Sequence, residues 1–375
     1  MKTSRIFIRI YHSKFSKALF FFTILLISLF AELAIYVELA CTQPTAIPDD
    51  NDPISTEETM SYTVYLPLVM HQDPIYAVWV QGRDVNTKAK ANAIIELVQQ
   101  GKFDTILLWV GHGIVTYQKT NLLNKYSTGG YDPLAYVIKL AHARNIKVQA
   151  WWSPGLAPTY MPFRKQHPEW DIASVTGIPS DYHWFNFSVP QARRFVGDVV
   201  LEIAENYDVD GIHLDVIRYP QPGYYPGVDP RDFFNETDVP HTVSSTYWRL
   251  KDQYAYVTLS AAVMDRGGEL NMQNWFEWLE GDYIDYVMPM AYYAPDDNAR
   301  LQTAIELWQE QHDEYRIIPG LSGVVNFSDE VPKTPSEFLA QLNMTRDANF
   351  LSFALFDITK TSEETIRAIG EYLPK

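Results

Sequence analysis

The stretch Asp210-Gly211-Ile212-His213-Leu214-Asp215-Val216-Ile217-Arg218-Tyr219-Pro220 decides the fold. Its middle is apolar and rich in β-branched residues, so we predict a buried strand over Gly211–Tyr219. Side chains alternate along a strand, which places His213 and Asp215 on one face and the aliphatic side chains on the other. Polar groups near the carboxyl end of such a strand indicate a functional site, because α/β sheets and barrels bind ligands there. The structural alternative is that Asp215 only forms an ion pair with Arg218.

The composition indicates a large, acidic and aromatic-rich folded body. The chain has 375 residues, 47% hydrophobic and 14% aromatic, which is enough for one large domain or two small ones. The first 40 residues carry a net charge of +3 and the remainder −19. A body this acidic repels phosphate backbones, so we expect no nucleic-acid partner. Its many rings favour neutral or cationic ligands, and sugars are one such class.

The N-terminus is predicted to be a targeting segment rather than part of the fold. Basic residues precede the apolar run Ala18–Ala31, which has the length of a signal-peptide core. Cys41 is the only cysteine, so no disulfide can form within the chain. It follows Leu39-Ala40, as in a bacterial lipoprotein cleavage site. Lipoprotein processing, ordinary signal cleavage and an uncleaved anchor stay open, and all three predict an exported protein.

Three regions are predicted: a signal peptide or anchor over residues 1–41, a linker over 42–74, and a (β/α)8 TIM barrel over 75–375. The linker is acidic and proline-rich and cannot bury enough apolar surface to fold. Beyond it, β-prone runs alternate with helix-period segments, as in a barrel of this size. The expected strands are Ile75–Val80, Thr105–Val110, Lys147–Trp152, Gly211–Tyr219, Tyr256–Val263, Tyr283–Tyr292, Tyr315–Leu321 and Phe350–Ile358. The expected helices include Asp132–Asn145, one opened by a capping box at Ser188, Asn298–His312, Pro335–Asp347 and Ser362–Leu373. A doubly wound sheet is the rival, but the glycine-rich phosphate loop typical of that fold is missing.

The two longest connections follow the third and fourth strands, over Ser153–Val189 and Gln221–Val243. Long βα loops at the carboxyl face of a barrel usually build the substrate site. The polar and aromatic residues at the strand ends are Gln81, Arg83, Asp84, His112, Trp151, Trp152, His213, Asp215, Arg218, Asp265, Glu269, Tyr292, Tyr293, Asp296, Asn326, Asp329 and Asp357. If the barrel is right, several carboxyl groups and indoles converge in space.

These residues favour paired-carboxylate chemistry over other hydrolytic chemistries. A metal hydrolase would want a His-x-His pair on the first strand, which reads Ala-Val-Trp-Val-Gln-Gly. A serine or cysteine nucleophile would need an elbow such as Gly-x-Ser-x-Gly, and the chain has none. Glycoside hydrolysis needs two carboxyl groups beside the scissile bond, and Asp215 suits one of the roles.

The strand-four stretch also resembles known glycosidase patterns. The chitinase pattern Asp-Gly-x-Asp-x-Asp-x-Glu is broken by His213 and by Ile217, which stands where the catalytic acid belongs. The α-amylase pattern Asp-Gly-x-Arg-x-Asp aligns its nucleophile with Asp215. The nearest resemblance is to the bacterial exported glycosyl-hydrolase-like family ten. It is carried by Tyr131–His142, Val148–Trp152, His167–Trp170, Tyr207–Pro220, Leu259–Val263, Gln273–Trp275, Trp278 and Ile284–Tyr292, all in the family's order.

The resemblance implies a barrel hydrolase acting on bacterial glycans, with relatives that act on peptidoglycan strands. It implies that Asp215 is the principal catalytic carboxylate, supported by Asp210 and His213. Asn274 and Ala291 stand where relatives often carry an acid, so the general acid is instead sought in the strand-five loop. There Glu269 comes first and Asp265 second, followed by Asp296 on the next loop.

The sequence therefore predicts an exported, monomeric glycosidase of the cell envelope or extracellular space that acts on a polysaccharide, needs no cofactor or metal, and meets a membrane only through its N-terminal segment. The predicted substrate-binding residues are His213, Arg218, His112, Trp152, Trp184, Tyr292 and Asp84. Adjacent strand residues point opposite ways, so at most one of Trp151 and Trp152 faces the lumen. Two alternatives stay open: a catalytically silent glycan-binding barrel, and a metal-dependent deacetylase using His112, His213 and Asp215.

Overall fold

The computed structural model describes residues 7–9, 36–41, 60–64, 73–156, 166–177, 184–223 and 229–374. The chain divides into two units, Met1–Asp73 and Pro74–Lys375. The first unit contains three short strands, β1 (Phe7–Arg9), β2 (Tyr36–Cys41) and β3 (Met60–Val64). The apolar run Ala18–Ala31 lies outside the described residues. No helix in the described ranges is long and apolar enough to cross a membrane.

The second unit is a closed barrel of eight parallel strands. They are β4 (Tyr76–Val80), β5 (Thr105–Gly111), β8 (Lys147–Trp152), β9 (Gly211–Leu214), β10 (Thr258–Val263), β11 (Tyr286–Ala291), β12 (Gly320–Ser322) and β13 (Phe353–Phe356). Each strand pairs in parallel with the next along the ring, and β4 closes it by pairing with both β5 and β13. Two short strands, β6 (Ile114–Val115) and β7 (Asn124–Lys125), extend the β5 edge. The predicted TIM barrel is confirmed.

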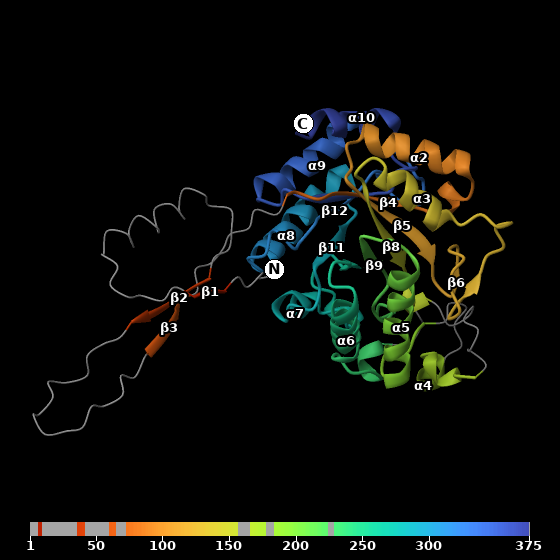
Figure 1. Ribbon diagram of the computed structural model, residues 1–375. Coiled ribbons are helices and arrows are strands. Elements are labelled where there is room, and N and C mark those ends of the chain that lie inside the picture. Colours follow the sequence, from red (N-terminus) through yellow and green to blue (C-terminus); the bar gives the residue numbers. More distant parts are fainter. Residues whose placement is uncertain are drawn as a thin grey trace, which may run out of the picture. The chain divides into compact units, whose positions relative to one another are not determined.

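Helices lie around the outside of the strands (Figure 1). They are α2 (Lys88–Gln100), α3 (Pro133–His142), α4 (Ala173–Thr176), α5 (Pro190–Asn206), α6 (Asp238–Gln253), α7 (Trp275–Glu280), α8 (Asn298–Gln309), α9 (Pro335–Asp347) and α10 (Glu363–Tyr372). Asp132 caps α3, accepting a hydrogen bond from the Ala135 amide, and Thr334 forms a capping box with Glu337 at the start of α9. The capping box predicted at Ser188 is wrong: Val189 is the N-cap of α5, and the Ser188 hydroxyl donates to Asn186 instead.

Strand β9 is shorter than predicted. It ends at Leu214 rather than at Tyr219, because Val216 turns the backbone to a φ of +51° and takes the chain out of the ladder. Gly155, in the loop after β8, lies so close to this turn that a Cβ atom there would meet the Val216 carbonyl oxygen at 2.0 Å. The site stretch is therefore a short strand followed at once by a tight, packed loop.

The barrel separates two apolar regions. Side chains on the outer faces of the strands, such as Ile212 and Leu214, pack under the helices. Side chains on the inner faces form a smaller lumen cluster that includes Trp79, Trp151 and Met288. The alternation predicted for β9 is thus confirmed, since His213 is buried inside the lumen while its neighbours face outward.

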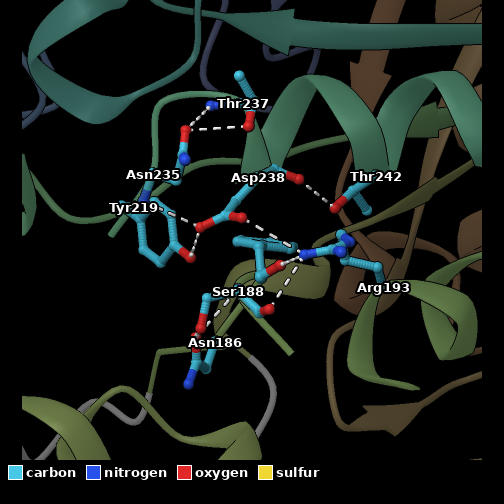
Figure 2. Close-up of polar contacts among 9 residues, drawn as sticks. Asn186, Ser188, Arg193, Tyr219, Asn235, Thr237, Asp238 and Thr242 are labelled. Carbon is cyan, nitrogen blue, oxygen red and sulfur yellow. Dashed lines mark hydrogen bonds and ion pairs between the residues drawn. The ribbon is translucent and has the colours of Figure 1, made fainter. Parts of the chain in front are cut away.

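A buried carboxylate joins the two long loops at the carboxyl face (Figure 2). One oxygen of Asp238, at the start of α6, lies 3.4 Å from the Arg193 guanidinium on α5. The other accepts from the Tyr219 hydroxyl at 3.5 Å and from the Asn235 amide at 3.1 Å. Arg193 also donates to the Phe187 carbonyl at 2.7 Å. The end of the loop after β8, the loop after β9 and the first turns of two helices are therefore fixed to one another.

Replacing Asp238 with alanine should lower the free energy of unfolding by about 2 kcal/mol, because it removes a charged acceptor and leaves buried donors without a partner. Urea unfolding followed by fluorescence measures this change. The control is Asp232→Ala on the exposed surface of the same loop, which should change stability by less than about 0.5 kcal/mol. Equal effects for the two variants would contradict the role given to Asp238.

Candidate functional site

A chain of hydrogen bonds crosses the lumen below the carboxyl face. His213 is fully buried, and its Nε2 accepts from the Trp79 indole at 3.1 Å. Its Nδ1 lies 2.8 Å from the Ser260 hydroxyl, which donates to Gln149 at 2.7 Å, and Gln149 donates in turn to Tyr286. In this order of donors the imidazole is neutral with its proton on Nδ1. Burial lowers the pKa of His213 to about 3.

These contacts correct the sequence prediction for His213. Both ring nitrogens are engaged inside the protein, so the side chain has no position from which to bind substrate. The imidazole is instead part of the support beneath the site.

Asp215 lies one step above this support, directly after β9, and is half-buried. Its Oδ2 accepts from the Trp151 indole at 3.0 Å, and its Oδ1 accepts from the Val216 amide at 2.7 Å. Burial raises the pKa of Asp215, while the Arg218 guanidinium and the two hydrogen bonds act in the opposite direction. The result is a carboxyl group held in a fixed position whose charge is only partly compensated.

Arg218 acts on this carboxyl group through its charge and packs against Trp184. The Arg218 guanidinium is 5.4 Å from the centre of the Trp184 ring, a cation–π distance. Trp184 is only 3% exposed, so it supports Arg218 and does not offer an open face to a sugar ring. The prediction of Trp184 as a substrate platform is corrected on that ground.

Aromatic rings form the floor of the barrel mouth. The half-buried Tyr292, directly after β11, stacks on Phe356 with ring centres 4.9 Å apart. Phe327 lies edge-on to Tyr292 at 5.4 Å and is exposed. Burial raises the pKa of Tyr292, and the negative charges of Asp215 and Asp357 raise it further. Tyr292 is thus within the electrostatic reach of two carboxyl groups that come from different strands.

Asp84 and Asp357 lie together on the rim formed by the first and last strands. The Thr359 hydroxyl lies 3.0 Å from an oxygen of each. The same Asp357 oxygen, Oδ1, also accepts from the Thr359 amide at 3.1 Å and the Lys360 amide at 3.0 Å. Asp357 is one of the strand-end residues of the sequence, and nothing in the sequence pattern distinguishes it as catalytic.

Of the two adjacent tryptophans, Trp151 faces the lumen, and the prediction of Trp152 as a substrate-binding residue is wrong. Trp152 is fully buried in the outer core, where its indole donates to the His112 carbonyl at 3.0 Å. It therefore cannot be a sugar platform, and Trp151 is the member of the pair that faces the lumen. The His112 ring is half-buried near Trp109, accepts from the Gly113 amide at 2.8 Å, and has its pKa lowered by burial.

The two acids predicted on the strand-five loop have different surroundings. Glu269 is exposed and starts the 3-10 turn Glu269–Asn271. Asp265 accepts from the Tyr293 hydroxyl, and Tyr293 packs in the outer core. Burial raises the pKa of Asp265. The exposure of Glu269 argues against it as the general acid, whereas Asp265 stays a candidate for that role.

The described residues contain no group of three or more histidine, cysteine, aspartate or glutamate side chains placed to hold a metal ion. The alternative set of His112, His213 and Asp215 is not brought together as metal ligands. His213 in particular has both nitrogens engaged by Trp79 and Ser260.

A family model described as glycosyl hydrolase-like 10 matches residues 74–264, which is half of the chain and includes β4 to β10. The chain belongs to this family. It is 22% identical over 293 residues to the glycosyl hydrolase YngK of Bacillus subtilis, covering 63% of this chain and 56% of that protein. It is 22% identical over 232 residues to the glycosyl hydrolase DigH of Escherichia coli K12, covering 48% of this chain and 50% of that protein. The chain thus spans about half the length of the curated relatives that it matches.

Solved structures with the same fold include several with glycosidase titles. The α-L-fucosidase isoenzyme 2 from Paenibacillus thiaminolyticus has a TM-score of 0.55 at 14% identity and covers 80% of this chain and 48% of its own. The C-terminal domain of a putative chitinase from Desulfitobacterium hafniense has a TM-score of 0.56 at 12% identity. The match covers 80% of this chain and 99% of that domain. The spore cortex-lytic enzyme SleL of Bacillus cereus has a TM-score of 0.55 at 10% identity. The match covers 84% of this chain and 77% of that enzyme. At these identities the likeness establishes the barrel fold alone.

Replacing Trp151 with phenylalanine should raise the pKa of Asp215, because the indole hydrogen bond favours the ionised carboxylate. Titration of the carboxyl carbon by NMR measures this shift. Trp79→Phe is the matched control: it removes an indole donor in the same lumen, but one that serves His213, and should leave the Asp215 titration unchanged. An unchanged pKa in Trp151→Phe would show that the indole does not hold the carboxylate.

Proposed function

We propose that this protein is a glycoside hydrolase in which Asp215 is the principal catalytic carboxylate. The observation that carries the proposal is the setting of Asp215: a half-buried carboxyl group at the carboxyl end of a barrel strand, oriented by two N–H donors beside a floor of rings. Membership of a glycosyl hydrolase-like family supports the reaction class.

Asp215 suits the role of nucleophile or general base. Trp151 and Val216 occupy one acceptor site on each of its oxygens, which fixes the carboxylate plane while other lone pairs stay available. In the ionised form it can attack the anomeric carbon or take a proton from an attacking water. Its negative charge also stabilises the positive charge that develops on the sugar ring in the transition state. Arg218 helps to keep it ionised.

The substrate that we propose is a polysaccharide of the bacterial envelope or of the extracellular space, with peptidoglycan glycan strands as the first candidate. Tyr292 and Phe327 supply ring surface at the barrel mouth for stacking against sugars. The acidic body disfavours phosphate-rich polymers. Export through residues 1–41, with lipid attachment at Cys41 or without it, and action as a monomer belong to the same proposal.

A second candidate function is a glycan-binding barrel without catalytic activity. One observation favours it: of the acids expected on the strand-five loop, Glu269 is exposed and Asp265 accepts a hydrogen bond from the Tyr293 hydroxyl. A binding protein would retain affinity for its glycan after loss of the Asp215 charge and would release no new reducing ends.

Replacing Asp215 with asparagine should reduce turnover by about 10³-fold or more, because the amide can neither attack nor accept a proton. The measurement is reducing-end release from purified peptidoglycan glycan strands and from a panel of soluble envelope polysaccharides. The control is Asp252→Asn, an exposed acid on α6, which should keep wild-type activity. Activity of Asp215→Asn equal to wild type would remove Asp215 from catalysis, and a wild type inactive on the whole panel would favour the binding protein.

The acidic limb of the pH–rate profile should lie above the ordinary aspartate pKa of about 3.9, because burial raises the pKa of Asp215 and the ionised form is the reactive one. Replacing Arg218 with glutamine should move this limb to higher pH, since the guanidinium lowers that pKa. Arg218→Lys keeps the charge and should move it less. A limb that stays in place in Arg218→Gln would contradict the electrostatic role of Arg218.

A further inference from the structure

Building on the proposed glycosidase function, we propose that Asp357 is the second catalytic carboxyl group and protonates the leaving oxygen of the glycosidic bond. Asp357 follows β13 directly, at the carboxyl end of the barrel. The sequence pattern and the family match, which ends at residue 264, do not single it out. The assignment rests on its position opposite Asp215, on its unsatisfied oxygen and on the rings between the two acids.

The strand order places Asp357 across the barrel mouth from Asp215. Strands β9 and β13 are separated by three strands in either direction around the ring, by β10, β11 and β12 on one side and by β8, β5 and β4 on the other. Asp215 directly follows the last residue of β9, and Asp357 directly follows the last residue of β13. Both acids therefore lie at the carboxyl end of the barrel. Glycoside hydrolysis requires two carboxyl groups that flank the scissile bond, and acids on opposite walls of one mouth can flank a sugar bound between them.

Aromatic rings connect the two acids. The Trp151 indole donates a hydrogen bond to Asp215. Its ring centre lies 6.2 Å from the ring centre of Phe356, the residue before Asp357. Tyr292 stacks on the same Phe356 at 4.9 Å, and the charges of both acids raise its pKa. The two carboxyl groups thus share one aromatic floor, on which a sugar bound between them would rest.

The two oxygens of Asp357 have different surroundings. Oδ1 is fixed by the Thr359 and Lys360 amides together with the Thr359 hydroxyl. Oδ2 is buried and has no hydrogen-bond partner among the described residues, and the residue as a whole is 1% exposed. An unsatisfied buried oxygen costs about 1–3 kcal/mol and is rare in folded proteins. In the proposed reaction a proton on Oδ2 is passed to the bound glycan, which gives this oxygen a function.

Burial is the largest influence on Asp357 and raises its pKa above the ordinary aspartate value. The hydrogen bonds from Thr359 and Lys360 and the charge of Lys360 act in the opposite direction, and the charge of Asp84 adds to the increase. The Lys360 ammonium group is also paired with Glu330 at 2.7 Å. A raised pKa favours the protonated form that transfer of a proton to a leaving oxygen needs.

In the proposed reaction the bond between the anomeric carbon and the glycosidic oxygen breaks as the Oδ2 proton of Asp357 passes to that oxygen. Asp215 either attacks the anomeric carbon or takes a proton from the water that attacks it. Net addition of one water across the bond restores a proton to Asp357 and leaves Asp215 ionised. No oxidant, reductant or further reactant is needed.

The test is the variant Asp357→Asn assayed on two substrates, peptidoglycan glycan strands and 2,4-dinitrophenyl N-acetyl-β-glucosaminide. The glycan needs a proton on its leaving oxygen, so its turnover should fall about 10³-fold. Dinitrophenolate leaves without a proton, so its release should fall less than about 10-fold, and the basic limb of its pH–rate profile should disappear. Glu364→Gln removes an exposed acid from the first turn of α10, the helix that follows β13, and should keep wild-type rates on both substrates.

Stability separates loss of chemistry from loss of fold. Because the pKa of Asp357 is raised in the folded state, its contribution to stability is present at low pH and is lost as the pH rises through that value. Asp357→Asn should therefore melt at or above the wild-type temperature at pH 7, and the difference should vanish at pH 3.

The outcomes distinguish the two proposals. Wild-type rates for Asp357→Asn on both substrates, with Asp215→Asn inactive, would overturn the role of Asp357 and leave the glycosidase in place. Equal losses on both substrates would also overturn it, because the loss would not depend on the leaving group. A wild type inactive on both substrates would overturn the glycosidase and this assignment together.

Discussion

The closed barrel imposes one constraint on all of its inner residues: a polar group in the lumen must find its hydrogen-bond partner on another strand. His213 meets this requirement through Trp79 on β4 and Ser260 on β10. Asp215 meets it one layer higher through Trp151 on β8. The position of the site follows from these pairings, because each one fixes a side chain of β9 against a neighbour that cannot move alone.

Depth in the barrel then divides the polar residues into two kinds. Below the mouth, the groups around His213 are neutral and have hydrogen-bond partners within the protein. They therefore support the site above them without reacting. At the mouth, burial raises the pKa of both Asp215 and Asp357, and one oxygen of Asp357 has no hydrogen-bond partner among the described residues. Acids with pKa values raised in this way are typical of functional sites. The Asp238 cluster joins α5, α6 and the segment after β9 through hydrogen bonds of its own.

The barrel and the position of Asp215 could be predicted from the sequence because both depend on local periodicity. Alternation along β9 correctly separated His213 and Asp215 from Ile212. The second acid could not be predicted, because it depends on how the chain turns beyond a strand. Gly267 and Gly268, with φ values of +79° and +74°, turn the strand-five loop so that Glu269 is exposed to solvent. Similarly, which of two adjacent tryptophans faces inward depends on register, which composition does not reveal.

The neutral imidazole of His213 has a consequence for where the protein can work. Unfolding would release this side chain to its ordinary pKa of about 6.5, whereas the folded barrel holds it at about 3. At pH values between these two pKa values, the imidazole is protonated in the unfolded chain and neutral in the folded chain. Acidification therefore progressively favours unfolding. The buried imidazole of His213 thus limits, on the acidic side, the pH range in which the barrel stays folded.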